Sequence, residues 1–235
     1  MSRARVAVVS GGNRGIGFEI CHQLAELGLS VVLTARDSEV AKERAESLAS
    51  AGEVLPFPLD VTAAESVSRL AEYVERELGG ADVLVNNAAI FPAEDRNHGA
   101  LDLPLGVARS TFETNLFGPW SLAQALAPGM KRRGYGRIVN LSSGLGSISE
   151  MSGGYPAYRL SKAALNALTV VLASELRGGD ILVNAVCPGW VQTEMGGPGA
   201  PRTAAQGADT ATFLATLPAG SPTGKLFRDR KVVGW

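Results

Sequence analysis

The chain has 235 residues, of which 46% are hydrophobic and 19% are charged, and its formal net charge is −1. This balance is typical of a globular chain and offers no general attraction to nucleic acid or to an anionic membrane surface. No apolar run reaches the ~18 residues of a membrane-spanning helix and no signal-peptide pattern opens the sequence, so we expect one soluble cytoplasmic domain over residues 1–235.

Short apolar runs alternate with longer segments of helical periodicity, a pattern typical of a parallel sheet with helices on both faces. We expect strands over residues 6–9, 31–34, 53–57, 83–85, 137–141, 181–186 and 225–227. We expect helices over residues 15–27, 38–49, 63–78, 107–132, 158–176 and 204–217. Two prolines place the third strand at a sheet edge. The order predicts an α/β Rossmann fold with a doubly wound, seven-stranded parallel sheet, in which ligands bind at the carboxyl ends of the strands.

A glycine-rich turn, Ser10 to Gly17, directly follows the first expected strand. Its key glycines are Gly11, Gly15 and Gly17, so the spacing differs from the common G-x-G-x-x-G fingerprint. Glycine permits positive φ and lets the backbone approach a pyrophosphate, which then lies at the N-terminus of the next helix. The turn predicts nucleotide binding but identifies no reaction.

The end of the second strand bears on the choice between the two nicotinamide cofactors. An acidic residue there binds the 2′-hydroxyl of the ribose, whereas arginine accommodates a 2′-phosphate. The strand ends in neutral Ala35 followed by Arg36, and Arg14 of the glycine turn could close on the same phosphate. Asp37 is interpreted as a cap of the next helix. These residues predict NADPH as the cofactor.

Tyr158 and Lys162 are four residues apart in an expected helix, so their side chains share one face. A phenol ionises near pH ~10, which is too high for easy proton exchange at neutral pH. A nearby ammonium favours the phenolate, so we expect Lys162 to lower the pKa of Tyr158 toward that of a working general acid. The two cysteines, Cys21 and Cys187, lack metal-ligand spacing, so we expect free buried thiols and no metal site.

Seven motifs, taken in order, resemble the short-chain dehydrogenase/reductase family, single-domain branch. They are the glycines of the turn, Leu59-Asp60-Val61, Asn86-Asn87-Ala88-Ala89, Thr114-Asn115-Leu116, Leu141-Ser142-Ser143, Tyr158 with Lys162, and Pro188-Gly189 with Thr193. Within the family, residues 33–37, 187–193 and 224–235 look most like carbonyl reductases, which reduce aldehydes, ketones and quinones with NADPH. The animal members carry a long insertion before the tyrosine that this chain lacks, which leaves the helices expected near residues 107 and 158 free to pair with a second subunit.

The resemblance implies four catalytic residues. Tyr158 would donate a proton to the carbonyl oxygen as hydride arrives from the nicotinamide, and Lys162 would lower the pKa of Tyr158 and bind the nicotinamide ribose. Ser143, rather than Ser142, would polarise the substrate carbonyl. Asn115 would interrupt its helix locally and hold a water that connects Lys162 to solvent.

The resemblance also implies a set of cofactor-binding residues. Asp60 would contact the adenine, Asn87 and Ala88 the adenosine ribose, and residues 188–193 the nicotinamide end. The full set is Gly11, Asn13, Arg14, Gly15, Ile16, Gly17, Arg36, Asp60, Val61, Asn87, Ala88, Tyr158, Lys162, Pro188, Gly189, Val191 and Thr193.

Three features depart from the family pattern. Ser10 stands where threonine is frequent, and Ala89 stands where glycine is usual. The spacing from Ser143 to Tyr158 is longer than the commonest one. We expect modest backbone adjustment, with Gly153-Gly154 absorbing the longer spacing.

The sequence therefore predicts NADPH-dependent reduction of a small carbonyl compound by a homodimer or homotetramer, without nucleic acid or membrane as a partner. One alternative is NAD(P)-dependent oxidation of a secondary alcohol or sugar by the same residues. Another is a protein that senses NADP(H) without turnover. Five residues are expected to line a largely apolar pocket suited to a hydrophobic or aromatic carbonyl: Leu145, Met151, Tyr155, Trp190 and Met195.

Overall fold

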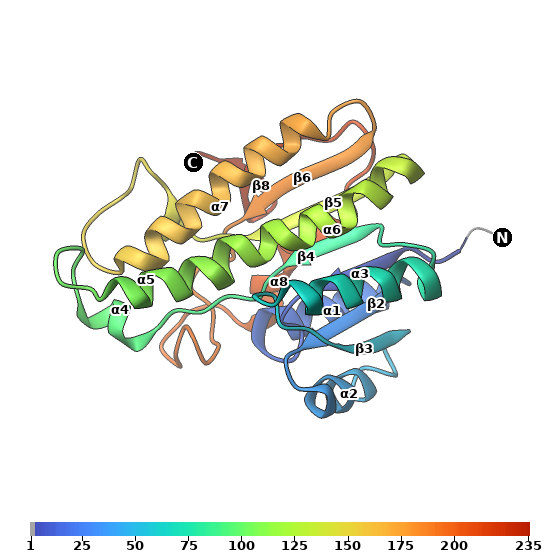
Figure 1. Ribbon diagram of the computed structural model, residues 1–235, viewed down its shortest axis with the longest axis horizontal. Helices are drawn as coiled ribbons and strands as arrows, with labels where there is room; N and C mark the ends of the chain where they lie inside the picture. The colour runs from blue at the N-terminus through green and yellow to red at the C-terminus, as the bar shows by residue number, and fades with distance from the viewer. Residues whose placement is uncertain (1–2) are drawn as a thin grey trace.

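The computed structural model describes residues 3–235 and arranges them as one sheet between two layers of helices (Figure 1). The strands are β1 (Val6–Val9), β2 (Ser30–Ala35), β3 (Val54–Pro58), β4 (Val83–Asn86), β5 (Tyr135–Leu141), β6 (Asp180–Val186), β7 (Leu226–Arg228) and β8 (Lys231–Val233). Their order in the sheet is β3-β2-β1-β4-β5-β6-β7-β8. The chain order reverses between β1 and β4, so the switch point, where such folds bind ligands, lies at the carboxyl ends of these two strands.

The doubly wound sheet is confirmed, and β3 lies at its edge as the prolines predicted. The expected number of seven strands is wrong, because an eighth strand returns antiparallel to β7. Asp229 and Arg230 connect these two strands with φ values of 50° and 59°. Two-residue turns with positive φ at both positions usually contain glycine or asparagine, so an Asp-Arg pair gave no hairpin signal.

The helices are α1 (Gly15–Glu26), α2 (Ser38–Glu46), α3 (Ala64–Leu78), α4 (Ala93–Asn97), α5 (Leu105–Phe112), α6 (Gly118–Arg133), α7 (Pro156–Glu175) and α8 (Ala204–Ala215). The helix expected over residues 107–132 spans Leu105 to Arg133, and the local interruption that the resemblance implied at Asn115 is confirmed. The helix is divided into α5 and α6 by a π-helical turn, Glu113–Phe117, which contains Asn115. The short helix α4 was not expected from the sequence.

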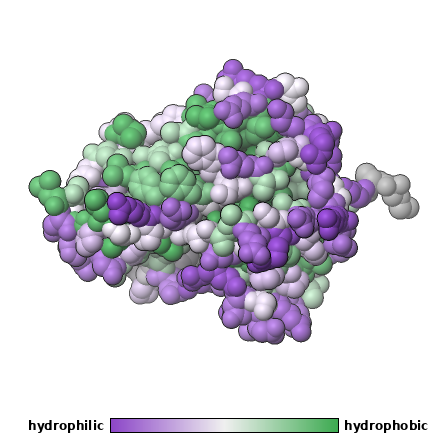
Figure 2. All heavy atoms as spheres, in the orientation of Figure 1, coloured by the Kyte–Doolittle hydropathy of each residue, from purple (hydrophilic) through white to green (hydrophobic). Residues whose placement is uncertain are grey.

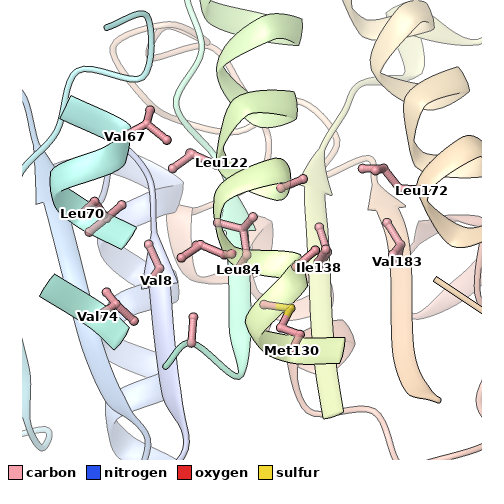
Figure 3. Close-up of a cluster of buried hydrophobic side chains, with 14 of the residues drawn as sticks. Val8, Val67, Leu70, Val74, Leu84, Leu122, Met130, Ile138, Leu172 and Val183 are labelled. Atoms are coloured by element: carbon pink, nitrogen blue, oxygen red, sulfur yellow. The ribbon is translucent and has the colours of Figure 1, made fainter. Parts of the chain in front are cut away.

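Two apolar clusters join the helices to the sheet. On one face, α3, α6 and α7 pack on the strands through residues such as Leu70, Leu122 and Leu172 (Figure 3). On the other face, α1 and α8 pack on the same strands through residues such as Ile20 and Leu214. Strands buried on both faces require continuous apolar runs, as the sequence of β1 shows. Within residues 3–235, no helix is both long and apolar enough to cross a membrane.

Candidate active site

The glycine turn lies at the carboxyl end of β1 and leads into α1. Gly11 and Gly15 have φ values of 64° and 54°, and a Cβ atom on Gly17 would lie 2.3 Å from both Asn87 Nδ2 and the carbonyl oxygen of Gly11. These positions therefore require glycine. Arg14 occupies the N-cap of α1 without a side-chain cap, and the first helical turn contains no acidic residue. The amides and the dipole at this end of α1 therefore suit an anion such as a phosphate.

Ser10 and Asn87 hold the glycine turn against the end of β4. Asn87 Nδ2 donates to the carbonyl oxygens of Ser10 and Gly11, at 2.9 Å each. Ser10 Oγ accepts the amides of Asn87 at 3.0 Å and of Ala88 at 3.1 Å. The serine hydroxyl thus makes the contacts that join the two motifs. Ala89 is not among the residues with positive φ, so alanine causes no backbone strain at this position.

Arg36 follows the end of β2 as an exposed side chain, and within residues 3–235 it forms no ion pair. Asp37 accepts the amides of Glu39 and Val40 at the start of α2, so its capping role is confirmed. The Asp60 carboxylate accepts the amide and the hydroxyl of Thr62 at 2.9 and 2.7 Å. These two bonds, and then the charge of Arg36, lower the pKa of Asp60. Asp60 is thus ionised beside an arginine at the carboxyl edge of the sheet.

The segment after β6 lies against the glycine turn. Thr193 is so close that a Cβ on Gly15 would lie 3.0 Å from its Cγ2 atom. Gly189 has a φ of 80°, and the carbonyl oxygen of Pro188 accepts Arg202 Nη1 at 3.1 Å. The structure therefore brings both ends of the expected cofactor set together.

Five residues of the expected cofactor set differ in their surroundings. Arg14, which was expected to close on the 2′-phosphate beside Arg36, forms an ion pair with Glu194 of the segment after β6. Val61 and Ile16 pack against the two core clusters rather than standing free in the site, and Val191 is buried. Asn13 is half-buried in the glycine turn.

Tyr158 lies near the start of α7 and Ser143 follows β5, and the two side chains form a hydrogen bond. Ser143 Oγ also accepts the amide of Leu145 at 3.2 Å. Ser142 points the other way, because its hydroxyl donates to Asn166 Oδ1 of α7 at 2.6 Å. The structure therefore places Ser143, not Ser142, at the phenol.

The pKa values differ from the expectation that Lys162 lowers the pKa of Tyr158. Burial raises the pKa of Tyr158 to about 12, although the hydrogen bond from Ser143 and the charge of Arg96 both act to lower it. Burial also lowers the pKa of Lys162 to about 8. Each charged form is disfavoured away from water, and the ammonium donates to the carbonyl oxygen of Leu141 at 2.7 Å rather than to the phenol. The phenol is therefore a protonated donor at neutral pH.

Asn115 is fully buried and binds the segment after β4. Its Oδ1 accepts the amide of Ile90 at 2.8 Å, and its Nδ2 donates to the carbonyl oxygen of Ile90 at 3.0 Å and to Ser161 Oγ at 3.1 Å. These are the bonds expected of a residue that fixes a loop. They join the π-helical turn to α7 one residue before Lys162.

Sequence reasoning missed three residues of the segment after β4. The Phe91 ring stacks on Tyr158 with centroids 4.4 Å apart and an interplanar angle of 23°. The guanidinium of Arg96 lies over the Phe91 ring, 4.1 Å from its centroid. Arg96 also donates to the carbonyl oxygen of Met195 at 2.8 Å. Asp95 accepts two amides of α7. The acidic pair Glu94-Asp95 after a proline was the available signal, since it is typical of a helix start.

The expected pocket residues lie on two segments: Leu145, Met151 and Tyr155 between β5 and α7, and Trp190 and Met195 after β6. Tyr155 meets Phe91 edge to face at 5.3 Å. Trp190 is exposed and donates to the carbonyl oxygen of Gly196 at 2.8 Å.

Gly154 has a φ of 79° and begins the turn into α7, in the segment that was expected to absorb the longer spacing between Ser143 and Tyr158. Arg159 binds the carbonyl oxygen of Gly154 and the hydroxyl of Ser152, which fixes this segment.

The strand order, the glycine turn at the switch point and the serine–tyrosine pair define a nucleotide-dependent oxidoreductase. A family model described as short chain dehydrogenase matches residues 5–202, and the chain belongs to this family. It is 34% identical over 282 residues to carbonyl reductase (NADPH) 1 of Sus scrofa, covering 100% of this chain and 95% of the relative.

Solved structures give the same assignment. The NADPH-bound carbonyl reductase from chicken fatty liver is 30% identical, with a TM-score of 0.87 and coverage of 100% of both chains. A short-chain type dehydrogenase/reductase from Mycobacterium marinum is also 30% identical, with a TM-score of 0.86 over 94% of this chain and 92% of the other.

Proposed function

We propose that the protein reduces a small carbonyl compound, an aldehyde, ketone or quinone, to the alcohol with NADPH. The observation that carries this proposal is the buried phenol of Tyr158, hydrogen-bonded to Ser143 and protonated at neutral pH. A protonated donor suits reduction, in which the carbonyl oxygen must receive a proton. Carbonyl reductases that use NADPH are among the relatives of the chain, which supports the same direction.

The residues present fit NADPH. The glycine turn leaves no room for a side chain at Gly17 and has a positive φ at Gly15, and the start of α1 presents its backbone amides to a pyrophosphate. Arg36 is exposed and unpaired with any carboxylate among residues 3–235, so it is our candidate for the 2′-phosphate. Pro188, Gly189 and Thr193 would hold the nicotinamide end. When bound, NADPH supplies the hydride for the reduction.

The catalytic residues divide the remaining work. Tyr158 Oη donates its proton to the carbonyl oxygen, and the Ser143 hydroxyl donates a second hydrogen bond to the same oxygen. Two preorganised donors in a buried site stabilise the negative charge that develops there. Lys162 has a pKa of about 8, so it can exchange protons near neutral pH and is our candidate for restoring the proton of Tyr158. Asn115 holds the segment after β4 in place beside this pair.

The reverse reaction is less well supported. Oxidation of a secondary alcohol needs a phenolate as the base, and burial disfavours that form at neutral pH. A protein that only senses NADP(H) would not require a serine hydroxyl bonded to a buried phenol. The reduction therefore remains our proposal.

The experiment is to follow NADPH and NADH consumption with a panel of aldehydes, quinones and diketones. Turnover of several members with NADPH supports the proposal. If both cofactors bind and no carbonyl is reduced, the alcohol direction is tested next with NADP⁺ and secondary alcohols. Failure of both directions with retained binding would favour a sensing role.

We also propose that the enzyme is a cytoplasmic homodimer or homotetramer. Exposed apolar side chains lie on α7, at Leu160, Val170 and Val171, and beside the start of α6, at Phe117 and Trp120. Figure 2 shows apolar surface over these helices. Sedimentation velocity of Val171→Glu, with Val232→Glu on β8 as a matched control, tests whether this face pairs with a second copy. An unchanged mass for Val171→Glu would refute that assignment.

A further inference from the structure

The helix that carries Tyr158 does not cap its own N-terminus. The N-cap residue, Tyr155, has φ 54° and ψ 45°, and its side chain accepts no amide. Pro156 has no N–H, and the amide of Arg159 bonds to the carbonyl oxygen of Tyr155 at 2.9 Å. The amides of Ala157 and Tyr158 are therefore the two donors of the first turn that need acceptors from elsewhere.

Asp95 of α4 supplies both acceptors. Its Oδ1 accepts the amide of Ala157 at 2.9 Å, and its Oδ2 accepts the amide of Tyr158 at 2.8 Å. The residue is 0% exposed, so water does not compete for either bond. A carboxylate at a helix N-terminus also interacts favourably with the helix dipole. A residue more than sixty positions away in sequence thus performs the capping that α7 lacks.

The same segment holds the side chain of Tyr158. Phe91 lies four residues before Asp95, and its ring stacks on the Tyr158 ring at 4.4 Å. Arg96, the residue after Asp95, lies 4.1 Å from the centroid of Phe91 and is bonded to Met195. The backbone of Tyr158 is therefore fixed by Asp95 and its ring by Phe91. A shift of α4 would move both anchors together.

We propose that Asp95 is a positioning residue for the reaction, because it fixes the first turn of α7 and with it the hydroxyl of Tyr158. This inference rests on the proposed role of Tyr158 as proton donor. Misplacing a reacting group by about 1 Å costs on the order of a hundredfold in rate. Among residues 3–235, both hydrogen bonds of Asp95 are made to α7 and none to the glycine turn, so NADPH affinity should change little when Asp95 is replaced.

The test uses Asp95→Asn, Asp95→Ala and a matched control, Asp82→Asn. Asp82 is also a buried carboxylate that accepts a backbone amide from a distant element, Val6 at 2.8 Å. It precedes β4 and therefore lies at the opposite edge of the sheet from the site. Four quantities are measured for each variant: the melting temperature, the NADPH dissociation constant, kcat with a carbonyl that the wild type reduces, and the solvent deuterium isotope effect on kcat. Hydrogen exchange of residues 155–162 is measured without cofactor.

For Asp95→Asn we expect kcat to fall by about tenfold, and for Asp95→Ala by about a hundredfold. The NADPH dissociation constant should stay within about twofold. The isotope effect should rise, because proton transfer becomes slower, and exchange at the start of α7 should accelerate. Asp82→Asn should lower the melting temperature and leave the other quantities unchanged.

Other results would overturn the inference. A kcat for Asp95→Asn equal to that of the wild type would do so. So would a loss of kcat with an unchanged isotope effect, since a smaller folded fraction lowers kcat without altering that ratio. If Asp95→Ala does not fold, Asp95→Asn decides the question. A wild type that reduces no carbonyl would refute the proposed function instead, and exchange at residues 155–162 would still report whether Asp95 holds the turn.

Discussion

Lys162 Nζ donates a 2.7 Å hydrogen bond to the carbonyl oxygen of Leu141, the last residue of β5. The bond holds a buried ammonium 5.7 Å from the centre of the Tyr158 ring. Burial lowers the pKa of Lys162 to about 8. The folded protein therefore holds the charged form of Lys162 less favourably than water does. Perturbed groups of this kind concentrate at functional sites.

Replacing this cation should make the protein more stable and less active. The pKa of Lys162 falls from 10.5 to about 8 on folding, and each unit corresponds to about 1.4 kcal/mol. The lost hydrogen bond to Leu141 offsets part of that gain. We expect Lys162→Met to raise the free energy of unfolding at neutral pH by about 1–3 kcal/mol and to lower kcat by about a hundredfold or more. Urea unfolding and NADPH consumption measure the two effects, and a destabilised variant with full activity would contradict both.

The rate of carbonyl reduction should fall as pH rises through about 8. Lys162 loses its proton at this pH, whereas Tyr158, with a pKa of about 12, stays protonated. Reduction consumes one proton from Tyr158 in each turnover. Once Lys162 is deprotonated, it can no longer return a proton to Tyr158, so turnover slows although Tyr158 itself is still protonated. Stability should change in the opposite direction: between about 8 and 10.5 the unfolded chain binds more protons at Lys162 than the folded chain, so stability rises with pH. Parallel profiles of kcat and melting temperature therefore separate this effect from unfolding.

Tyr158→Phe should abolish turnover and leave NADPH binding nearly unchanged. The substitution removes the proton donor but keeps the ring that stacks on Phe91. General acid catalysis of this kind contributes about a hundredfold to ten-thousandfold. Tyr155→Phe is the matched control, because Tyr155 also contacts Phe91. Loss of turnover in the control alone would assign proton donation to Tyr155.

The two neighbouring serines should respond differently to alanine. Ser143→Ala removes the hydroxyl bonded to Tyr158, and we expect kcat to fall by about a hundredfold. Ser142→Ala leaves Asn166 Oδ1 without the hydroxyl that now donates to it, so we expect a loss of about 1–3 kcal/mol in stability with kcat largely retained. Chemical unfolding and kinetics on both variants check this. If Ser142→Ala lowered kcat and Ser143→Ala lowered only the stability, Ser142 would be the serine of the site.

Arg36→Ala should weaken NADPH much more than NADH. A hydrogen-bonded charge pair contributes about 1.5–3 kcal/mol, or about tenfold to a hundredfold in affinity, and only NADPH carries the 2′-phosphate. Lys42→Ala removes another cation from α2 and serves as the control. The measurement is the dissociation constant of each cofactor by fluorescence titration. Equal weakening of both cofactors would remove the basis for assigning the phosphate to Arg36.

The sheet and the nucleotide-binding turn could be predicted because their signals are local. Buried parallel strands require continuous apolar runs, and close backbone approach requires glycine at positions such as Gly17. The prolines of β3 predicted its edge position for a similarly local reason. The β7–β8 turn was missed because Asp229 and Arg230 adopt positive φ without glycine.

The surroundings of the site depend on tertiary contacts and could not be read from spacing. The spacing of Tyr158 and Lys162, which are four positions apart, correctly predicted a shared helix face. Spacing did not reveal that both groups are buried, or that the ammonium bonds to Leu141. The local sequence around Asp95 gave no sign of its role, because its two partners lie in a distant helix.

The π-helical turn at Glu113–Phe117 also determines how sensitive the chain is to changes of length. Such a turn contains one residue more than the α-helical turn it replaces. Each residue of an α-helix advances the chain by about 100° around the axis. Deleting one residue there would restore a regular helix. It would also rotate α5 about its axis by that angle, so that Thr111, which is now buried, would no longer face the core. Substitutions at this turn change one side chain, whereas a one-residue deletion changes the phase of every side chain before it.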